Sequence, residues 1–431
     1  MPTIRRPGDG TRGRRRPTGG SQGSPRRHNL GTLLRHLHLT GPLSRAELTA
    51  RMELNRSTIG ALVSELVLLG AVSEERPGGS QTTAGRPSLV VTPRIDRVQV
   101  LAADVGVQRV RVALVGLGGQ VLARRYRRVT TSTPEAVARL LGTLVEAVLR
   151  DPAAGDRVIG IGVSIAGMVR QRDGCVRFAP NLGWIDAPFG DLVGRRLGTS
   201  QVRIGNDADL GALAEHLRGV ARGVDNVVFL SGDIGVGGGL ILDGRPLRGA
   251  GGYAGELGHM RVRSGGRSCR CGATGCWETE VGAGAVARAL GMPAAGVQEV
   301  LTALHRLDGN DPVLAQVATS LGLGLASLVN LVNPQQVILG GLLQQVYRVG
   351  APLVHAELSR AALVAPAEQV LIATPELGAD VLLAGAAELA WEPLLADPAG
   401  VLRRAAGRGL PVGLSAGLSA GLSVVERTIG A

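Results

Sequence analysis

The chain has 431 residues, enough for two or three domains and a sizeable buried core. With 45% hydrophobic but only 2% aromatic residues, that core must be aliphatic. All 47 basic residues are arginine, a bias that genomic base composition explains, so no function is inferred from it. The formal net charge of +12 has a visible origin, because arginines crowd the start of the chain.

Residues 1–27 form this basic stretch, which holds one acid, Asp9, among Pro, Gly and Ser residues. Its arginines are Arg5, Arg6, Arg12, Arg14, Arg15, Arg16, Arg26 and Arg27. A segment of this composition has too little apolar surface to fold, so we expect a disordered arm. The arm is predicted to attract a polyanion, and a merely solubilising tail is the alternative.

The sequence shows no targeting or membrane segment. No apolar run of the signal-peptide kind follows the arginines, and the apolar stretch from Val317 to Val332 is interrupted by polar residues. These are Thr319, Ser320, Ser327 and Asn330. We therefore expect a cytoplasmic protein that does not span a membrane.

Residues 28–95 are predicted to form a winged helix-turn-helix domain. Leucines recur at helical spacing in its first part, Pro42 breaks that run, and Ser44 is placed to cap a second helix. Asn55 is the expected N-cap of a third helix that ends near Gly70. Three short helices with a tight second turn predict a helix-turn-helix.

The third helix is expected to present the polar face of its first turn to the major groove of DNA. That turn consists of Arg56, Ser57 and Thr58. Two strand candidates follow at residues 72–74 and 88–91, and the loop between them is typical of a wing. Arg86 in this loop is placed to reach the minor groove or a phosphate. The alternative is a three-helix interaction module that contacts no nucleic acid.

A different pattern begins at Val98. Alternating Val and Leu residues around a glycine turn predict two strands, followed by a helix from about Pro134 to Arg150 and a strand from Val158 to Ile165. Strands that alternate with helices predict a mixed α/β domain. We place this domain at residues 96–398.

The stretch from Gly255 to Glu280 concentrates metal ligands. They are His259, Cys269, Cys271 and Cys276, at the spacing H-x9-C-x-C-x4-C. Structural Zn²⁺ favours a closed tetrahedral shell of Cys thiolates and His imidazole. Gly272 and Gly275 suit a loop that folds tightly around an ion, because such loops need backbone angles that a Cβ resists. Buried free thiols or a disulfide are the alternatives, and the remaining Cys175 is expected to be a single thiol.

Two segments of this stretch, GELGH and CRCGATGCWE, resemble the signature of the ROK family (repressors, open reading frames and sugar kinases). The resemblance covers about Val98 to Pro398 and is closest to the winged-helix transcriptional regulators of the family. It implies an α/β protein in which a two-lobed actin-like (sugar kinase/ribonuclease H-like) domain follows the winged helix-turn-helix. A hinge near residues 206–210 and a helix at about 380–395 that returns to the first lobe are part of this expectation.

The resemblance also implies a sugar site. Asn181 matches the family's first hydroxyl-binding asparagine, and Asn206 with Asp207 match the dipeptide whose aspartate is the base in kinases. The remaining hydroxyl contacts match Glu256, His259 and Glu278. Carboxylates, amides and an imidazole suit a ring of hydroxyls, because each hydroxyl both donates and accepts a hydrogen bond.

The nucleotide half departs from the family's kinases. Positions that still match are Asp104, Gly106, Gly235, Gly237, Gly340 and Gly341. In the first phosphate loop, however, Val107 and Gln108 replace the kinases' Gly and Thr, and in the second Asp233 and Ile234 replace Gly and Thr. An aspartate repels a triphosphate, and an isoleucine side chain offers no hydrogen bond. We therefore do not expect ATP or Mg²⁺ to bind.

Two functions of different class remain. The first is a DNA-binding regulator, a repressor of carbohydrate-related genes, whose operator affinity is controlled by a sugar or sugar derivative. The second is an ATP-dependent, glucokinase-like hexose kinase with an appended DNA-binding domain, in which Asp207 is the catalytic base. The degenerate phosphate loops favour the first, which implies a sensor without catalysis.

Two further expectations concern assembly and the C-terminus. One recognition helix contacts only a few base pairs, so the regulator is predicted to bind DNA as a homodimer or homotetramer. Residues 399–431 include a Gly-Leu-Ser-Ala repeat at 413–423 and are predicted to be a low-complexity tail.

Overall fold

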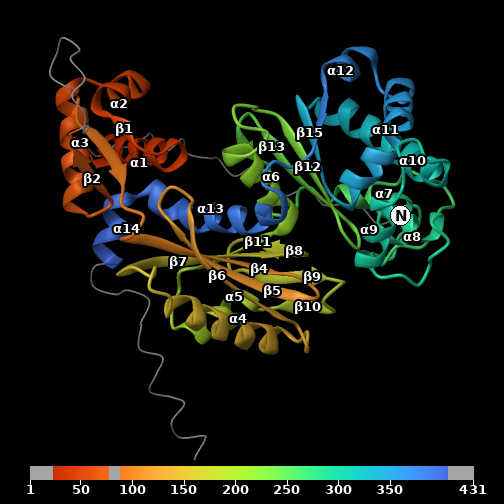
Figure 1. The fold of residues 1–431 in the computed structure, drawn as a ribbon, viewed down its shortest axis with the longest axis horizontal. Coiled ribbons are helices and arrows are strands. Elements are labelled where there is room, and N and C mark those ends of the chain that lie inside the picture. Colours follow the sequence, from red (N-terminus) through yellow and green to blue (C-terminus); the bar gives the residue numbers. More distant parts are fainter. Residues whose placement is uncertain (1–22, 77–87, 406–431) are drawn as a thin grey trace, which may run out of the picture.

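The computed structural model describes residues 23–76 and 88–405. They form a small N-terminal unit followed by two α/β lobes (Figure 1). Arg86 and the 413–423 repeat lie outside the described residues, as does most of the predicted arginine-rich arm.

The N-terminal unit contains three helices and a three-stranded antiparallel sheet of order β1-β3-β2. Its elements are α1 (Gly23–Thr40), β1 (Leu43–Ser44), α2 (Arg45–Met52), α3 (Arg56–Leu68), β2 (Val72–Glu75) and β3 (Val90–Pro93). Both predicted caps are confirmed. The Ser44 side chain accepts from the Glu47 backbone N–H in a capping box, and Asn55 Oδ1 accepts from the Thr58 N–H at 2.8 Å.

The structure moves two predicted boundaries. Helix α1 begins at Gly23, so Arg26 and Arg27 are helical rather than part of a disordered arm. The reason is a tertiary contact that composition does not reveal, since Arg26 Nη2 lies 2.7 Å from Glu65 Oε2 on α3. At the other end, helix α14 (Pro398–Ala405) extends into the predicted tail because Leu402 is buried in the core.

The first lobe is built on a five-stranded sheet of order β11-β7-β4-β5-β6. β4, β5 and β6 are antiparallel, whereas β7 is parallel to β4 and β11. Alternate residues of β4 enter two different cores, which face α4 on one side and α13 on the other (Figure 1). The elements are β4 (Val98–Val105), β5 (Arg109–Gly116), β6 (Val121–Arg128), α4 (Pro134–Leu149), β7 (Arg157–Ile165), β8 (Met168–Arg170), β9 (Cys175–Ala179), β10 (Trp184–Ala187), α5 (Phe189–Leu197), β11 (Val202–Asn206) and α13 (Val381–Ala396).

The second lobe contains a five-stranded sheet of order β14-β13-β12-β15-β16. Helix α6 packs on one face of this sheet, and α10 and α11 pack on the other. Residues 207–210, predicted as a hinge, form the first turn of α6. The elements are α6 (Asp207–Arg218), β12 (Val227–Gly232), β13 (Val236–Leu242), β14 (Arg245–Pro246), α7 (Trp277–Val281), α8 (Ala283–Ala289), α9 (Val297–His305), α10 (Ala315–Val332), β15 (Gln336–Gly341), α11 (Leu342–Ala361), α12 (Val364–Gln369) and β16 (Leu371–Ala373).

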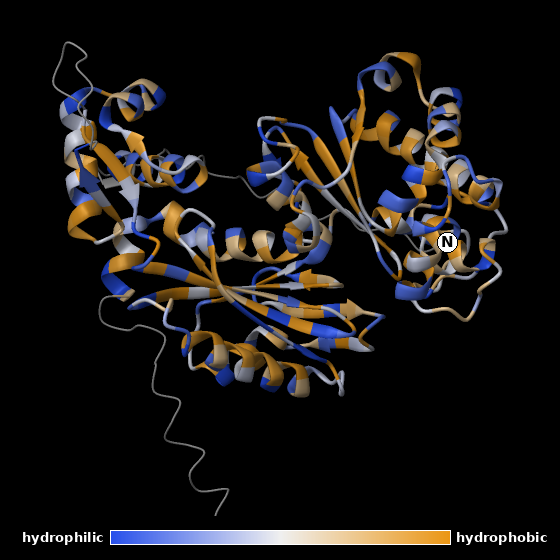
Figure 2. Cartoon of the chain, in the orientation of Figure 1, coloured by the Kyte–Doolittle hydropathy of each residue, from blue (hydrophilic) through white to orange (hydrophobic). Residues whose placement is uncertain are grey.

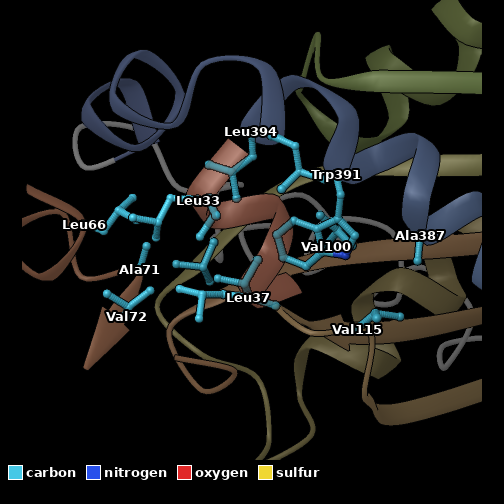
Figure 3. Close-up of a cluster of buried hydrophobic side chains, with 14 of the residues drawn as sticks. Leu33, Leu37, Leu66, Ala71, Val72, Val100, Val115, Ala387, Trp391 and Leu394 are labelled. Atoms are coloured by element: carbon cyan, nitrogen blue, oxygen red, sulfur yellow. The ribbon is translucent and has the colours of Figure 1, made fainter. Parts of the chain in front are cut away.

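One apolar core joins the N-terminal unit to the first lobe. Trp391 and Leu394 of α13 pack with Leu33 and Leu37 of α1, and the same cluster reaches Val100 on β4 (Figure 3). Each of these five side chains is fully buried. The N-terminal unit therefore packs against the first lobe through a continuous hydrophobic interface and is not connected to it by a linker alone.

The strands at the middle of both sheets are largely hydrophobic, as an aliphatic core requires (Figure 2). One helical stretch, Pro312–Val332, is long and apolar enough to cross a membrane. It contains α10, which packs against α11 in the core of the second lobe, and 61% of its apolar window is buried. The apolar residues of this stretch are therefore explained by its packing in the core of the second lobe.

Candidate functional site

A cleft of about 470 Å³ lies between the two lobes. All six predicted sugar contacts line it: Asn181, Asn206, Asp207, Glu256, His259 and Glu278. Four of the predicted nucleotide positions also line it: Asp104, Gly106, Gly235 and Gly237. The remaining two, Gly340 and Gly341, do not belong to its lining. At Gly341, φ is +60° and an added Cβ would lie 2.1 Å from the Gly232 carbonyl oxygen, so its role here is packing.

The four predicted metal ligands come together at the edge of the cleft. One ligand atom from each of His259, Cys269, Cys271 and Cys276 lies within 4.8 Å of the others. Cys271 Sγ is 3.7 Å from Cys276 Sγ, and Cys269 Sγ is 3.7 Å from His259 Nδ1. Two thiolates on a tetrahedral Zn²⁺ with bonds of about 2.3 Å lie roughly 3.8 Å apart. The donor set and its spacing thus fit a tetrahedral ion, and none of these thiols is in a disulfide.

The segment from Gly255 to Glu280, the ligand loop, carries all four predicted ligands. Its glycines and one tryptophan fix its conformation. As expected, Gly272 and Gly275 have φ of +90° and +72°, and a Cβ on Gly275 would lie 1.8 Å from the Arg263 carbonyl oxygen. Trp277, which follows the last ligand, is fully buried and donates from Nε1 to the Ser320 carbonyl oxygen on α10 at 2.9 Å. The loop is therefore attached to the core of the second lobe.

The ligand loop also presents carboxylates to the cleft. His259 Nδ1 faces the sulfur of Cys269, while its Nε2 lies 3.8 Å from Glu256 Oε2. Glu278 Oε1 accepts from Cys269 Sγ at 2.8 Å, and Glu278 Oε2 accepts from the Val236 N–H at 3.4 Å. An imidazole that ligates a metal through one nitrogen fixes the group facing the other.

The structure gives Asn206 a role that the sequence did not predict. Its Oδ1 accepts from the backbone N–H groups of Ala208 and Asp209 at 2.8 and 3.1 Å, and its Nδ2 donates to the Gly167 carbonyl oxygen. The Asn206 amide is thus the N-cap of α6. It fixes Asp207, the first residue of α6, in the cleft.

The cleft is strongly acidic. The pKa of Asp207 is raised to about 7, mainly by burial and also by the carboxylates of Asp104, Asp233 and Glu256, while the hydrogen bond from the Ala208 N–H opposes the shift. Burial likewise raises the pKa of Asp233, with Asp104 adding to the effect. Like charges in a half-buried space disfavour ionisation of all of them.

Arginines occupy the nucleotide half of the cleft. Arg111 pairs with Asp104 across the β4–β5 hairpin, through Nε at 3.0 Å and Nη2 at 2.9 Å. The other guanidinium nitrogen of Arg111 donates to the Ala379 carbonyl oxygen at 2.7 Å. In this arrangement the carboxylate of Asp104 is already neutralised, and Arg109 also lines the cleft. Alternation along β5 and the hairpin register are the signals that predict the Asp104–Arg111 pair.

A second arginine that the sequence did not single out links the lobes. Arg270 stands between the ligands Cys269 and Cys271, and its Nη1 donates to Asn181 Oδ1 at 2.6 Å. This hydrogen bond crosses from the ligand loop of the second lobe to the first lobe. Only its position within the ligand loop points to it in the sequence.

Three of the four predicted DNA-contacting residues are among the described residues, and they form the first turn of α3 in the N-terminal unit (Figure 1). Arg56 and Ser57 are exposed and Thr58 is half-buried at the start of α3, where Ser57 Oγ donates to Asn55 Oδ1 at 2.8 Å. In the ranges 23–76 and 88–405, Arg56 makes no ion pair. Its guanidinium is therefore available at a helix N-terminus.

Comparison with protein families matches residues 100–392 to the ROK family. The xylose repressor of Caldicellulosiruptor bescii is 30% identical over 317 residues, which cover 69% of this chain and 79% of the repressor. A solved ROK family transcriptional regulator, a homologue of the E. coli MLC protein, has a TM-score of 0.73 and 27% identity over 89% of this chain and 99% of its own. A ROK family glucokinase from Streptomyces griseus, solved with glucose and AMPPNP, has a TM-score of 0.58 and 28% identity over 68% of this chain and 99% of its own.

The raised pKa of Asp207 predicts a pH-dependent stability. The native protein binds a proton there more tightly than the unfolded chain, whose pKa is near 3.8. Stability is therefore lost as the pH rises from about 4 to about 7. In sugar-free protein, Asp207→Asn should raise the free energy of unfolding at pH 8 by on the order of 2 kcal/mol, and by less at pH 5. Urea unfolding at both pH values measures this.

The control for this experiment is Asp308→Asn, which changes an exposed carboxylate outside the cleft. It should leave the pH profile of the wild type unchanged. Equal effects of Asp207→Asn at pH 5 and pH 8 would contradict the assignment.

Proposed function

The chain belongs to the ROK family, and we propose from this that it is a transcriptional repressor of carbohydrate-related genes. A sugar or sugar derivative bound in the cleft controls its affinity for operator DNA. The observation that carries the proposal is the N-terminal unit. It shares a hydrophobic core with the first lobe and accompanies a sugar cleft whose phosphate loops depart from those of the family's kinases at Val107, Gln108, Asp233 and Ile234.

The comparisons support a regulatory N-terminal unit. The regulator matches 89% of this chain, whereas the glucokinase matches 68%. The regulator thus matches about a fifth more of this chain than the glucokinase does. This additional part is longer than the stretch after residue 392, so the match to the regulator includes residues before residue 100, where the ROK family match begins. The xylose repressor, 30% identical, supports the same class of function.

The N-terminal unit is, in this proposal, a winged helix-turn-helix. Helix α2, the turn at residues 53–55 and α3 supply the helix-turn-helix, and the β2–β3 hairpin supplies the base of the wing. Arg56, Ser57 and Thr58 read bases in the major groove, and Arg86 contacts the minor groove or a phosphate. A homodimer or homotetramer places two such units on two half-sites of double-stranded DNA in the cytoplasm.

The cleft supplies the sensor. Asn181, Asp207, Glu256, His259 and Glu278 bind sugar hydroxyls, and Asn206 positions Asp207. A structural Zn²⁺ held by His259 and the three thiolates of the loop keeps these groups in place. Five carboxylates face a space that contains two arginines, which favours a neutral sugar over a nucleotide triphosphate.

Asp207 favours a second candidate, an ATP-dependent hexose kinase with an appended DNA-binding domain. Asp207 stands at the start of α6, where it can accept the proton of a sugar hydroxyl. Against this function stand the departures from the kinases at Val107, Gln108, Asp233 and Ile234, and the ion pair that occupies Asp104.

The first prediction of the proposal concerns the metal. Freshly purified protein should contain one Zn²⁺ per chain, because one ligand atom from each of the four residues lies within 4.8 Å of the others. Cys271→Ser should lose the metal and weaken sugar binding together, since one loop carries the zinc ligands, Glu256 and Glu278. Elemental analysis and isothermal titration with sugar measure both effects. Cys175→Ser is the matched control and should retain metal and affinity, and a zinc content near zero in the wild type contradicts the site.

The second prediction tests the regulator itself. Titration of fluorescent DNA from upstream of the chain's own gene should give an affinity that changes about 5–150-fold when xylose, glucose or a related sugar is present. Asp207→Asn should abolish this change and leave operator binding intact. Arg56→Ala should do the reverse, with a loss of base discrimination of about 1–3 kcal/mol and a retained sugar effect. The absence of an effect with every sugar of the panel would refute the proposal.

The third prediction separates the two candidate functions. With Mg-ATP and a panel of hexoses, a coupled assay should detect negligible phosphorylation, because two loop positions that should donate hydrogen bonds are apolar or acidic. Turnover on the order of 10 per second would identify the chain as a kinase.

A further inference from the structure

Helix α6 runs from the sugar cleft to the N-terminal unit. Its first residue is Asp207, in the cleft, and its last is Arg218. Twelve residues at 1.5 Å per residue give a rod of about 18 Å. The side chain of Arg218 reaches His38, in the last turn of α1.

The contact at this far end is a buried polar cluster between three elements. His38 is fully buried, and its Nε2 lies 3.1 Å from Glu388 Oε2 on α13. Arg218 Nε donates to Glu388 Oε1 at 2.5 Å, and its Nη1 donates to the Gly118 carbonyl oxygen at 2.9 Å. The Gly118 N–H donates to His38 Nδ1 at 3.0 Å, and Arg218 Nη2 lies 2.6 Å from His38 Nε2, so both ring nitrogens have partners.

Among the described residues, this cluster is the one polar point that we find in an otherwise apolar interface of α1 with α13. It lies beside Trp391, whose ring centroid is 5.3 Å from that of His38. Burial alone would raise the pKa of Glu388, but His38 and Arg218 outweigh it and hold that pKa at about 2. The buried carboxylate of Glu388 is stable as a charge only while His38 and Arg218 keep these positions. The cluster therefore favours one orientation of α1 on α13.

Helices α6 and α13 are tied to each other along their length. An added Cβ on Gly385 of α13 would lie 2.1 Å from the Leu210 carbonyl oxygen of α6, which shows how closely the two backbones approach. Glu215 of α6 accepts from the backbone N–H groups of Glu376 and Leu377, just before α13, at 3.2 and 3.0 Å. A displacement of α6 therefore passes to α13.

Two open spaces border the N-terminal half of α6. The sugar cleft lies at its first residue, and a second cavity of about 860 Å³ borders Asp209, Leu210 and Leu213. The C-terminal half is held by Glu215 and Arg218. A ligand that engages Asp207 thus acts on one end of a helix that contacts α13 at Leu210 and α1 at its other end.

We propose that α6 and the Arg218–His38–Glu388 cluster transmit sugar binding to the DNA-binding unit by changing how α1 sits on α13. The inference rests on the proposed function and names the regulation of the same site. Sugar binding favours one position of α6, and the cluster converts that position into one orientation of the N-terminal unit. The three residues contact neither sugar nor DNA and act by positioning.

The test measures the coupling factor, the ratio of operator dissociation constants with and without saturating xylose or glucose, whichever has the larger effect on the wild type. In Glu388→Gln this factor should fall from the wild-type value to less than about 2-fold, whereas sugar affinity and sugar-free operator affinity each change less than about 3-fold. Glu392→Gln is the matched control. Glu392 lies one turn further along α13 and pairs with Arg203 and Arg248 instead of α1, so its variant should keep the wild-type factor.

Arg218→Lys decides the matter if thermal unfolding shows that Glu388→Gln is not folded. Lysine keeps the charge but lacks the planar fork that bonds Glu388 and Gly118 together, so the coupling factor should also fall. A wild-type coupling factor in folded Glu388→Gln or Arg218→Lys would overturn the inference, as would loss of sugar or operator binding itself. A wild type that no sugar affects would instead refute the proposed function.

Discussion

The burial of α13 is the constraint on which the other parts of the molecule depend. This helix packs against the first sheet, against α6 and against α1, and its residues Trp391 and Leu394 belong to the core that includes the leucines of α1 (Figure 3). A Cβ on Gly31 of α1 would lie 2.4 Å from the Leu395 carbonyl oxygen, so the two helices are in backbone contact. Domains joined by a small polar interface move independently by default, whereas a large apolar one makes their motions dependent on each other.

The ligand loop has a similar double connection within the second lobe. Trp277 anchors it to α10, and the residues before and after its cysteines face the cleft. The predicted metal ligands, the carboxylates of Glu256 and Glu278, and the interlobe contact of Arg270 all belong to one segment. A change in the conformation of the ligand loop therefore has two effects. It moves the side chains that are offered to a sugar, and it alters the hydrogen bond from Arg270 to Asn181 that links the lobes.

Much of this could be predicted from local sequence. The caps at Ser44 and Asn55 and the clustering of His259 with three cysteines were predictable because each depends on residues close in the chain. The ion pair of Arg26 with Glu65, which starts α1 early, joins residues 39 apart, and Arg218 meets Glu388 across 170 positions. No periodicity reports such pairs. Asn206 shows a different limit, since the same amide chemistry suits a sugar hydroxyl and a helix N-cap, and only the backbone geometry shows its use as a cap.

The same lobes can serve a kinase or a sensor, and the difference lies in what their motion is attached to. A kinase must open and close on every turnover, so its lobes need to move without displacing another domain. In this chain the C-terminal end of α6 contacts Glu388 and His38, and α13 packs against the N-terminal unit, so in the proposed mechanism a shift of α6 on sugar binding reorients that unit. The substitutions at Val107, Gln108, Asp233 and Ile234 then remove nothing that a sensor needs. The free energy of sugar binding is available to change DNA affinity, within the difference in sugar affinity between the two arrangements.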